Sequence, residues 1–417
     1  MDESALTRQV TSQVPTAGSS GSRMQGSIKL EAVDAIRGWA IFLVMVAHVG
    51  SLFPELPYPV KRVTNFGWYG VLLFFIASAF TLMLSWNRMK GDTGTRTFNF
   101  FLRRLFRIAP AFYLGALLYV FVRPPASHFD VSQLLATLLF VNAWSPDWMT
   151  TVEGRWQVVP GSWSVSVEFC FYFAFPLIAL FVRNALQACA FALGAMCLMV
   201  ISPSLGVRLH GSAESTPGLD NFLFFWPPNQ LVVFSLGLVL YFLVAGSNGM
   251  SGVRRIFERS ATPILVAGVM AILLLTLIPI RKTALATTVS YPLPTHVVVS
   301  AAFAAICAAL VLSPGRYRLV TGLPWRKLGE ASFAAYLLHW TMLDVAHAVQ
   351  GTLHLKSEGW WAIVHYSMFL AGVTASTFVL SSVAHSMIEK PMIALGRRLE
   401  RRPAFAGPSL NAGKHGA

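Results

Sequence analysis

Arg37 and His48 differ most sharply from their surroundings, because both polar side chains stand in a strongly apolar segment. Eleven residues of α-helix advance about 16 Å and complete three turns plus roughly 20°, so both side chains share one helical face. An imidazole can act as a base or a nucleophile, and a guanidinium binds anionic groups. Two structural roles would also fit: a membrane-surface anchor for Arg37 and an interhelical hydrogen bond for His48.

A second basic group, made of Arg103, Arg104 and Arg107, precedes the third long apolar segment. Arg104 and Arg107 are three residues apart and therefore point the same way on a helix. Guanidinium forks match phosphate oxygens geometrically, which indicates a site for a phosphorylated molecule. The alternative is a set of positive charges that orients the segment in a membrane.

A third group, Trp163, Ser164 and Glu168, opens the fourth apolar segment. Ser164 and Glu168 are four residues apart and share a helical face. A carboxylate inside a membrane needs a partner, and a glutamate can orient a histidine and raise its basicity. We therefore expect Glu168 to assist His48, although a purely structural Glu–His or Glu–Arg pair would give the same pattern.

A fourth group, Ser332, Tyr336 and His339, follows one helical stripe in the segment 328–350. Small polar side chains of this kind often form a packed seam between membrane helices, and this is the favoured interpretation for Ser332. For His339 a structural role and a functional role are both open.

The elements that must position these residues are membrane helices. Of the 417 residues 12% are charged and 55% are hydrophobic, whereas soluble domains carry about 25% charged residues. Apolar runs of roughly 18–25 residues recur along the chain, long enough to cross a hydrocarbon core of ~30 Å. The predicted fold class is an all-α transmembrane helix bundle, with membrane lipid as a partner.

The net charge of +14 does not indicate nucleic-acid binding. Lys and Arg cluster in short segments between the apolar runs, as they do where charge sets membrane topology. The four cysteines all lie in apolar stretches and show no paired spacing. We therefore expect no disulfide framework and no metal site.

Ten spans are predicted, and the positive-inside rule decides their number. The doubtful eleventh segment, 131–144, is about fourteen residues long, which is short for a crossing. Ten spans with a cytoplasmic N-terminus place 24 of the 32 Lys and Arg inside and 8 outside, whereas an eleventh span gives 15 and 17. Both termini are therefore expected in the cytoplasm, with 131–144 re-entrant or interfacial. The predicted spans are 36–53, 68–86, 109–122, 162–182, 185–202, 229–246, 262–280, 295–313, 328–350 and 362–385.

Three regions follow from this division of the chain. Residues 1–28 are rich in Ser, Gly, Gln and Thr and are expected to form a disordered cytoplasmic tail. Residues 29–395 form the transmembrane domain, and residues 396–417 form a basic cytoplasmic tail.

Taken together and in order, these segments resemble the membrane-bound acyltransferase type 3 family over nearly the whole chain. Ala79 and Phe333 stand where the family usually has Gly and Tyr. The matching motifs are Val33–Gly38 with His48, Tyr69–Gly70 with Phe74–Phe75 and Ser78–Phe80, Arg104 with Arg107, Trp163–Ser164 with Glu168, Tyr336–Trp340, and Ile388–Pro391.

The resemblance implies an acyl-CoA donor, with acetyl-CoA as the favoured one, and no permanently bound cofactor. It implies an acceptor hydroxyl on a cell-envelope or exported carbohydrate, or on a lipid-linked sugar, and a place in the bacterial cytoplasmic (inner) membrane. His48 would be the essential base or acyl relay and Arg37 its partner. Arg104 and Arg107, with Arg103 beside them, would bind the CoA phosphates.

The residues and the resemblance combine into one hypothesis, in which His48, Glu168 and Arg37 form the catalytic group. Arg103, Arg104 and Arg107 bind the donor. The substrate-binding residues are Ser164, Trp163, Tyr336 and His339.

Two alternatives stay open. Ten spans and a few intramembrane charges also suit a transporter that exports a small acidic or acylated molecule, although the sequence has no inverted repeats or paired broken helices. Within the enzymes, similar families acylate macrolides or peptides instead of sugars. The aromatic residues of the outer segments suit sugar stacking and membrane interfaces equally well.

Overall fold

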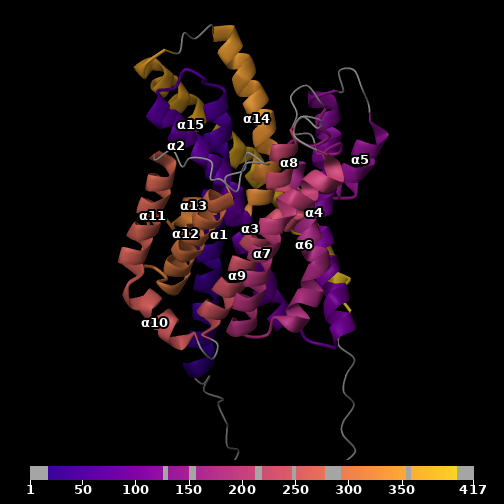
Figure 1. The fold of residues 1–417 in the computed structure, drawn as a ribbon, viewed down its shortest axis with the longest axis vertical. Helices are drawn as coiled ribbons and strands as arrows, with labels where there is room; N and C mark the ends of the chain where they lie inside the picture. Colours follow the sequence, from indigo (N-terminus) through magenta and orange to yellow (C-terminus); the bar gives the residue numbers. More distant parts are fainter. Residues whose placement is uncertain are drawn as a thin grey trace, which may run out of the picture.

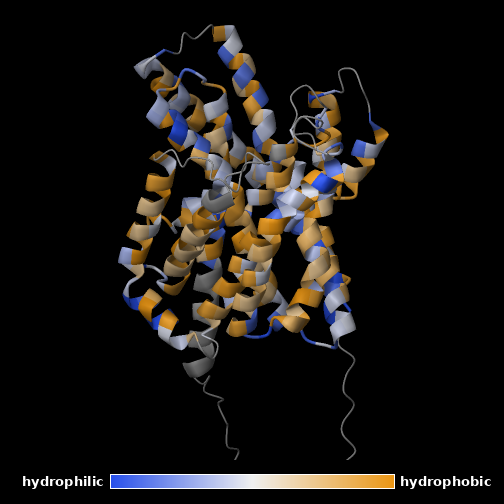
Figure 2. Ribbon diagram, in the orientation of Figure 1, coloured by the Kyte–Doolittle hydropathy of each residue, from blue (hydrophilic) through white to orange (hydrophobic). Residues whose placement is uncertain are grey.

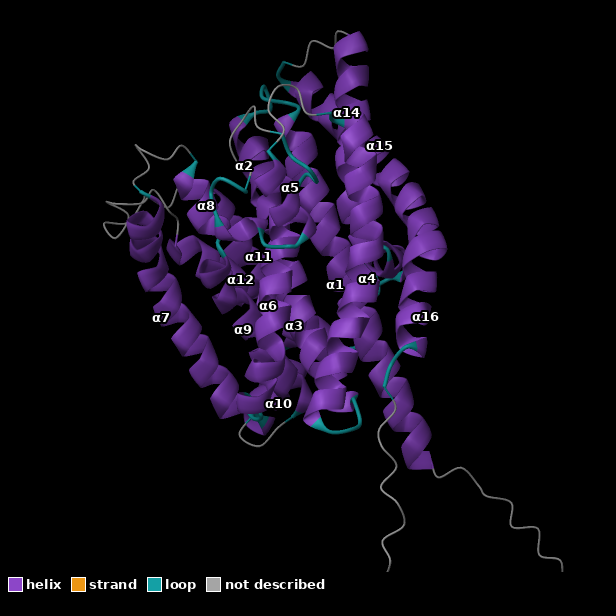
Figure 3. Cartoon of the chain, turned by 90° about the vertical axis from the view of Figure 1, so that its right-hand side faces the viewer, coloured by secondary structure: helices purple, strands orange, loops and turns teal. Residues whose placement is uncertain are grey.

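The described chain is a bundle of α-helices that run mostly along one axis (Figure 1). This computed structural model describes residues 17–124, 130–149, 156–211, 218–246, 250–277, 293–353 and 358–401, with the backbone alone for residues 17–30, 220 and 293–295. No strand is present in any of these ranges, as Figure 3 also shows. The predicted all-α class is confirmed for them.

Seven helical stretches are long and apolar enough to cross a membrane. An eighth forms if the bent pair α10–α11 is counted as one span, with an 83° bend between its two helices. The seven are built on α1 (Ala17–Ser51), α3 (Gly70–Arg88), α4 (Thr93–Val122), α6 (Ser162–Phe181), α7 (Ala185–His210), α9 (Pro227–Ala245) and α15 (Trp360–Ala384).

The three other predicted spans also fall on helices: α11 (Ala261–Leu277), α12 (Leu293–Leu312) and α14 (Ser332–Leu353). None of the three counts as a span by itself over its described residues: α11 has 17 residues, α12 has 20 but its side chains are described only over 296–312, and α14 is less apolar. In α14 the cause is its polar content, which includes His339 and Asp344. The helical positions thus agree with the sequence, whereas the count of ten spans is not established by length and composition.

Short helices lie between the long ones: α2 (Tyr58–Phe66), α5 (Val131–Leu138), α8 (Leu219–Phe225), α10 (Ser251–Arg259), α13 (Leu323–Glu330) and α16 (Lys390–Arg398). The doubtful segment 131–144 contains α5, which has eight residues, and a 3₁₀ turn at Asn142–Trp144. Eight helical residues span about 12 Å. No single helix of this segment crosses a membrane.

The two described ends lie on the same side of the bundle (Figures 1 and 3). Helix α1 begins at Ala17, so residues 17–28 of the predicted disordered tail are helical backbone, and residues 1–16 lie outside the described residues. The C-terminal end is held against α4, because the Asn99 side chain donates to the Arg401 carbonyl and accepts from its N–H. Residues 402–417 of the predicted basic tail lie outside the described residues.

Figure 2 shows apolar residues through the middle of the bundle and polar ones gathered mainly toward its two ends. Large apolar side chains are also exposed on the outer helices, such as Leu186 at 79% and Leu177 at 60%. Polar groups, including His48, His339 and Arg104, are buried inside. An apolar exterior, with the buried polar groups facing other helices, is what a lipid solvent requires.

The backbones of helices α1 and α13 lie in direct contact, and this contact fixes the position of α1 beside α13. A Cβ on Gly38 would collide with the Trp325 carbonyl, and a Cβ on Gly329 would collide with the Asp34 carbonyl. Only glycine permits such a close crossing. The Trp39 and Trp325 rings stack beside it at 3.7 Å.

Candidate active site

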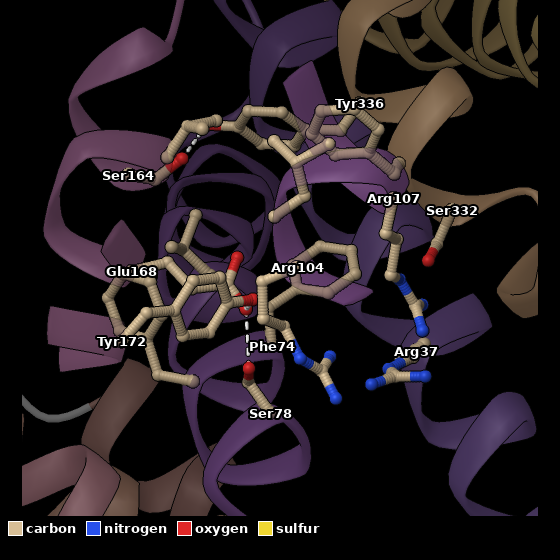
Figure 4. Close-up of a pocket in the computed structure, with 15 residues that line it drawn as sticks. Arg37, Phe74, Ser78, Arg104, Arg107, Ser164, Glu168, Tyr172, Ser332 and Tyr336 are labelled. Atoms are coloured by element: carbon tan, nitrogen blue, oxygen red, sulfur yellow. Dashed lines mark hydrogen bonds between the residues drawn. The ribbon is translucent and has the colours of Figure 1, made fainter. Parts of the chain in front are cut away.

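Two of the three arginines predicted to bind the donor come together, and Arg37, which was predicted as the partner of His48, lies with them and not in the pocket of His48. Arg37 from α1 and Arg104 and Arg107 from α4 line one pocket of about 610 Å³, here called the arginine pocket. Their guanidinium groups gather on one side of it in Figure 4. The remaining lining residues are Val71, Phe74, Phe75, Ser78, Ile108, Ser164, Val165, Glu168, Tyr172, Ser332, Phe333 and Tyr336.

Arg37 is partly neutralised on its own helix. Its guanidinium lies 3.7 Å from the Asp34 carboxylate, one turn earlier, and donates to Thr81 Oγ1 of α3 at 3.0 Å. These contacts fix the head group at the pocket wall. Arg37 therefore lies inside the protein as part of a site, and not at its surface as a snorkelling anchor.

Arg104 and Arg107 form no ion pair with any carboxylate in the described parts of the chain. Arg104 is 8% exposed, its Nε has no hydrogen-bond partner, and its guanidinium lies over the Phe100 and Tyr172 rings at 5.8 and 5.7 Å. Like charges gathered in a partly dry pocket repel one another. An anion with several oxygens would satisfy them together.

Arg103 differs from its neighbours. It donates twice to the Glu400 carboxylate, at 2.8 and 2.6 Å, and does not line the arginine pocket. One residue on a helix is a turn of about 100°, so Arg103 and Arg104 face different directions. The structure gives Arg103 a contact with the C-terminal segment in place of the predicted donor contact.

Glu168 lies in the arginine pocket and accepts two hydrogen bonds. Tyr172 Oη, one turn further along α6, donates at 2.5 Å, and Ser78 Oγ of α3 also donates. Ser164 lines the same pocket from one turn earlier, as the predicted shared face requires. Both donors to Glu168 are hydroxyl groups, so the contacts that hold it in this pocket come from α3 and from its own helix.

His48 lies in a second pocket of about 1,120 Å³, here called the histidine pocket. Its ring packs edge-on against Trp68 at 4.4 Å and against Trp340 at 4.0 Å between centroids. The predicted substrate-binding residue Trp163 lines this pocket and contacts the Phe225 ring at 3.9 Å. The other lining residues are Val44, Val71, Gln157, Gly161, Asn221, Phe224 and Tyr336.

The expected contact between Glu168 and His48 is not present. No hydrogen bond joins the two described residues, and they line different pockets. Helical spacing predicts which way Glu168 points, but not which neighbouring helix meets it. Ser78 on α3 occupies that place.

Tyr336 and Val71 line both pockets and form the partition between them. The Tyr336 hydroxyl donates to the Gly161 carbonyl at 3.0 Å and accepts from Ser164 Oγ at 2.8 Å. Figure 4 shows this pair on the opposite side of the arginine pocket from the guanidinium groups. Gly161 caps α6 with φ +74°, a conformation that favours glycine.

His339 lies behind His48, fully buried, with a centroid separation of 5.2 Å between the two rings. It lines neither pocket, so its predicted contact with the acceptor is not direct in this structure.

Several residues of the two pockets were given no site role from the sequence, among them Ser78, Tyr172, Trp68 and Gly161. Tyr172 follows Glu168 by one turn, a spacing that could have identified it. The others come from separate elements. In the described ranges, no group of three or more His, Cys, Asp or Glu side chains could hold a metal ion.

Membrane-length helices around a cationic pocket and an adjoining imidazole pocket define a polytopic membrane protein with two adjoining polar pockets. The family model for an acyltransferase domain matches residues 30–385, and the chain belongs to the acyltransferase type 3 family. It is an O-acyltransferase, and the transporter alternative loses its support.

A curated relative is similar along almost the whole length of the chain. It is the acyltransferase MdmB of Streptomyces mycarofaciens, 27% identical over 403 residues, which cover 91% of this chain and 95% of the relative. No solved structure matches the chain.

Proposed function

We propose that the protein moves an acyl group, in the favoured case acetyl, from acyl-CoA to a hydroxyl of a cell-envelope or exported carbohydrate. The observation that carries this proposal is the pair of adjoining pockets. The arginine pocket suits a polyanionic donor, the histidine pocket contains a base, and the two meet at Tyr336 and Val71.

The donor enters by the arginine pocket. Its phosphates lie on Arg104 and Arg107, which have no carboxylate partner in the described chain, and Arg37 supports them from α1. Arg37 and His48 are separated by about 16 Å of helix. The long pantetheine arm of CoA carries the thioester over this distance, past the partition, toward His48.

The transfer step needs a base beside the thioester. His48 takes the proton of the acceptor hydroxyl while the hydroxyl oxygen attacks the thioester carbonyl. The C–S bond breaks, an ester forms, and the CoA thiolate takes the proton from His48. All atoms and protons of this step are accounted for, and His48 returns to the protonation state in which it began.

The acceptor occupies the histidine pocket. This pocket has the larger volume and an aromatic lining that includes Trp68, Trp163 and Trp340. Indole faces stack on the apolar faces of sugar rings, and Gln157 and Asn221 add hydrogen-bonding groups. A carbohydrate, free or lipid-linked, fits this lining.

The proposed topology follows the charge distribution. Ten crossings, with α11, α12 and α14 among them, put both described ends in the cytoplasm and most Lys and Arg on that side. The arginine pocket then lies toward cytoplasmic acyl-CoA, and the histidine pocket lies toward the outside. The corresponding membrane is the bacterial inner membrane.

Acyl transfer in isolated membranes tests the proposal. Radiolabelled acetyl-CoA and a cell-envelope glycan extract are supplied to membranes with the wild type, with His48→Ala, or with His347→Ala as a control on exposed α14 surface. We expect label in glycan with the wild type and the control only. Equal labelling by His48→Ala would refute the role of His48, and label that enters only non-carbohydrate material would refute the acceptor class.

A further inference from the structure

We infer that His339 is a positioning residue for His48: its imidazole accepts a hydrogen bond from His48 and directs the other His48 nitrogen toward the acceptor. This inference rests on the proposed function, in which His48 is the base. His339 would then be the residue that orients the His48 ring, a role that was expected of Glu168 but that Glu168 does not fill.

The tautomer of His339 follows from a single contact. Its Nδ1 lies 2.7 Å from the backbone carbonyl oxygen of Tyr336. A carbonyl oxygen can only accept, so Nδ1 carries the proton. In a neutral imidazole the other nitrogen, Nε2, is then an acceptor with a free lone pair.

This acceptor is buried and unused. His339 is 0% exposed, and its Nε2 has no hydrogen-bond partner within the described chain. A buried polar atom without a partner is costly, and such atoms in native proteins usually mark a missing partner or a functional role.

Two side chains that could donate lie beside it: His48 and Trp340, whose ring centroids are 5.2 and 5.3 Å from that of His339, and of these only the imidazole of His48 is also the proposed base. The structure contains no hydrogen bond between the two described rings, which are tilted by 50°; a turn of the His48 ring that points one nitrogen at His339 Nε2 would make this bond across the centroid separation. No hydrogen bond of the His48 side chain to another described residue is present to hold its ring in another orientation.

The other charged groups at this end of α14 are already paired. Arg123 donates to Asp344 at 2.8 and 2.5 Å, and its guanidinium lies over the Trp340 ring at 5.3 Å. Trp68 and Trp340, which flank His48, are uncharged. Glu168 is bonded to Ser78 and Tyr172 in the arginine pocket.

The pair divides the work of a base between two rings. One His48 nitrogen takes the hydroxyl proton, while the N–H at the other nitrogen stays bonded to His339 Nε2 and the new positive charge is shared along that bond. His339 keeps its own proton on Nδ1 throughout. The proton held by His48 then passes to the thiolate sulfur of CoA.

Three variants of the purified full-length enzyme separate this role from others. His339→Gln can place an amide oxygen near the Nε2 position, whereas His339→Asn keeps only a donor near the Tyr336 carbonyl. His347→Asn, an exposed histidine two turns along the same helix, is the matched control. Each is assayed for kcat, for the acceptor KM, and for the pH profile of kcat, with acetyl-CoA as donor.

We expect His339→Asn to lower kcat on the order of 100-fold, with the acceptor KM nearly unchanged and the pH profile displaced. His339→Gln should recover much of that loss, and His347→Asn should behave as the wild type. Loss of kcat that is equal in Gln and Asn variants, or a rise in KM at constant kcat, would overturn the inference.

A spectroscopic measurement gives a readout besides activity. With ¹⁵N-labelled histidine, the His48 ring signals should shift in His339→Asn and return toward the wild type in His339→Gln. Unchanged His48 signals in both would also overturn the inference. If His48→Ala retains full activity, the proposed function of His48 as the base is wrong. If His48→Ala is inactive but His339→Asn is fully active, only the positioning role of His339 is wrong.

Discussion

Replacing Gly161 by Ala tests whether Tyr336 must keep its place between the two pockets. A Cβ at Gly161 would lie 2.9 Å from the Tyr336 hydroxyl, 3.3 Å from its Cζ, and 3.1 Å from Trp340 Nε1. A Cβ atom essentially never approaches another heavy atom as closely as 2.9 Å, so the phenol ring must move. Its hydrogen bonds to Ser164 and to the Gly161 carbonyl are then weakened or lost.

The free-energy change has two parts, and the chain offers a control for one of them. Gly161 has φ +74°, and an alanine in that conformation costs roughly 1–2 kcal/mol. Gly315 has φ +79° with no atom near its Cβ position, so Gly315→Ala carries the same backbone cost alone. Gly161→Ala also loses two hydrogen bonds of about 1 kcal/mol each. It should therefore lower the free energy of unfolding by about 2 kcal/mol more than Gly315→Ala does.

Thermal unfolding in detergent and steady-state acyl transfer are measured for both variants. Since a misplacement of about 1 Å can cost on the order of 100-fold in rate, we expect Gly161→Ala to lower kcat by about 10- to 100-fold, and Gly315→Ala to leave it unchanged. Adding Tyr336→Phe to Gly161→Ala removes the nearest atom, so the double variant should lose less stability than the sum of the single changes. If Gly161→Ala and Gly315→Ala agree in both stability and turnover, the reasoning is wrong.

Three further expectations concern charge. Arg104→Ala should raise the KM for acyl-CoA, measured by steady-state kinetics, by roughly 10- to 100-fold, which is the value of one charge-assisted contact. Arg103→Ala should leave this KM unchanged, because Arg103 is paired with Glu400. Glu168→Gln should leave the midpoint of the kcat–pH profile in place, since Glu168 does not touch His48, and a displaced midpoint would contradict this. Asp92 caps α4, and its hydrogen bonds from the Thr95 side chain and from backbone N–H groups hold the pKa of its carboxyl below the usual range. That stabilisation is full above the ordinary carboxyl pKa and is lost as pH falls through the lowered pKa, so acid unfolding followed by circular dichroism should be less steep in Asp92→Asn.

Helical periodicity predicted directions well. It placed Ser164 and Glu168 on one face of α6, and both line the arginine pocket. It also put Arg104 and Arg107 on a common side of α4. These results depend only on the 100° turn between successive residues, which a single helix determines by itself.

Periodicity could not predict which helix each face meets. The Glu168 carboxylate meets Ser78 of α3, because α3 lies beside α6 at that level, and His48 meets His339 of α14. Arg103 carries the same charge as Arg104, yet it pairs with Glu400, 297 residues away. Contacts of this kind depend on the packing of the whole bundle, and glycines such as Gly38 and Gly329 determine it at positions that carry no chemical signal.

The partition at Tyr336 answers a difficulty of any acyl transfer that works across a bilayer. In the proposed topology an open path between the two pockets would join the aqueous phases on either side of the membrane, and water at the reacting carbonyl would compete with the acceptor hydroxyl. Excluding water also strengthens the electrostatic interactions that hold the donor. Helix α1 contributes Arg37 to one pocket and His48 to the other, so one rigid element reaches both pockets. Tyr336 and Val71 close the space between, and in the proposed reaction the pantetheine arm alone is narrow enough to pass them while the phosphates stay behind on the arginines.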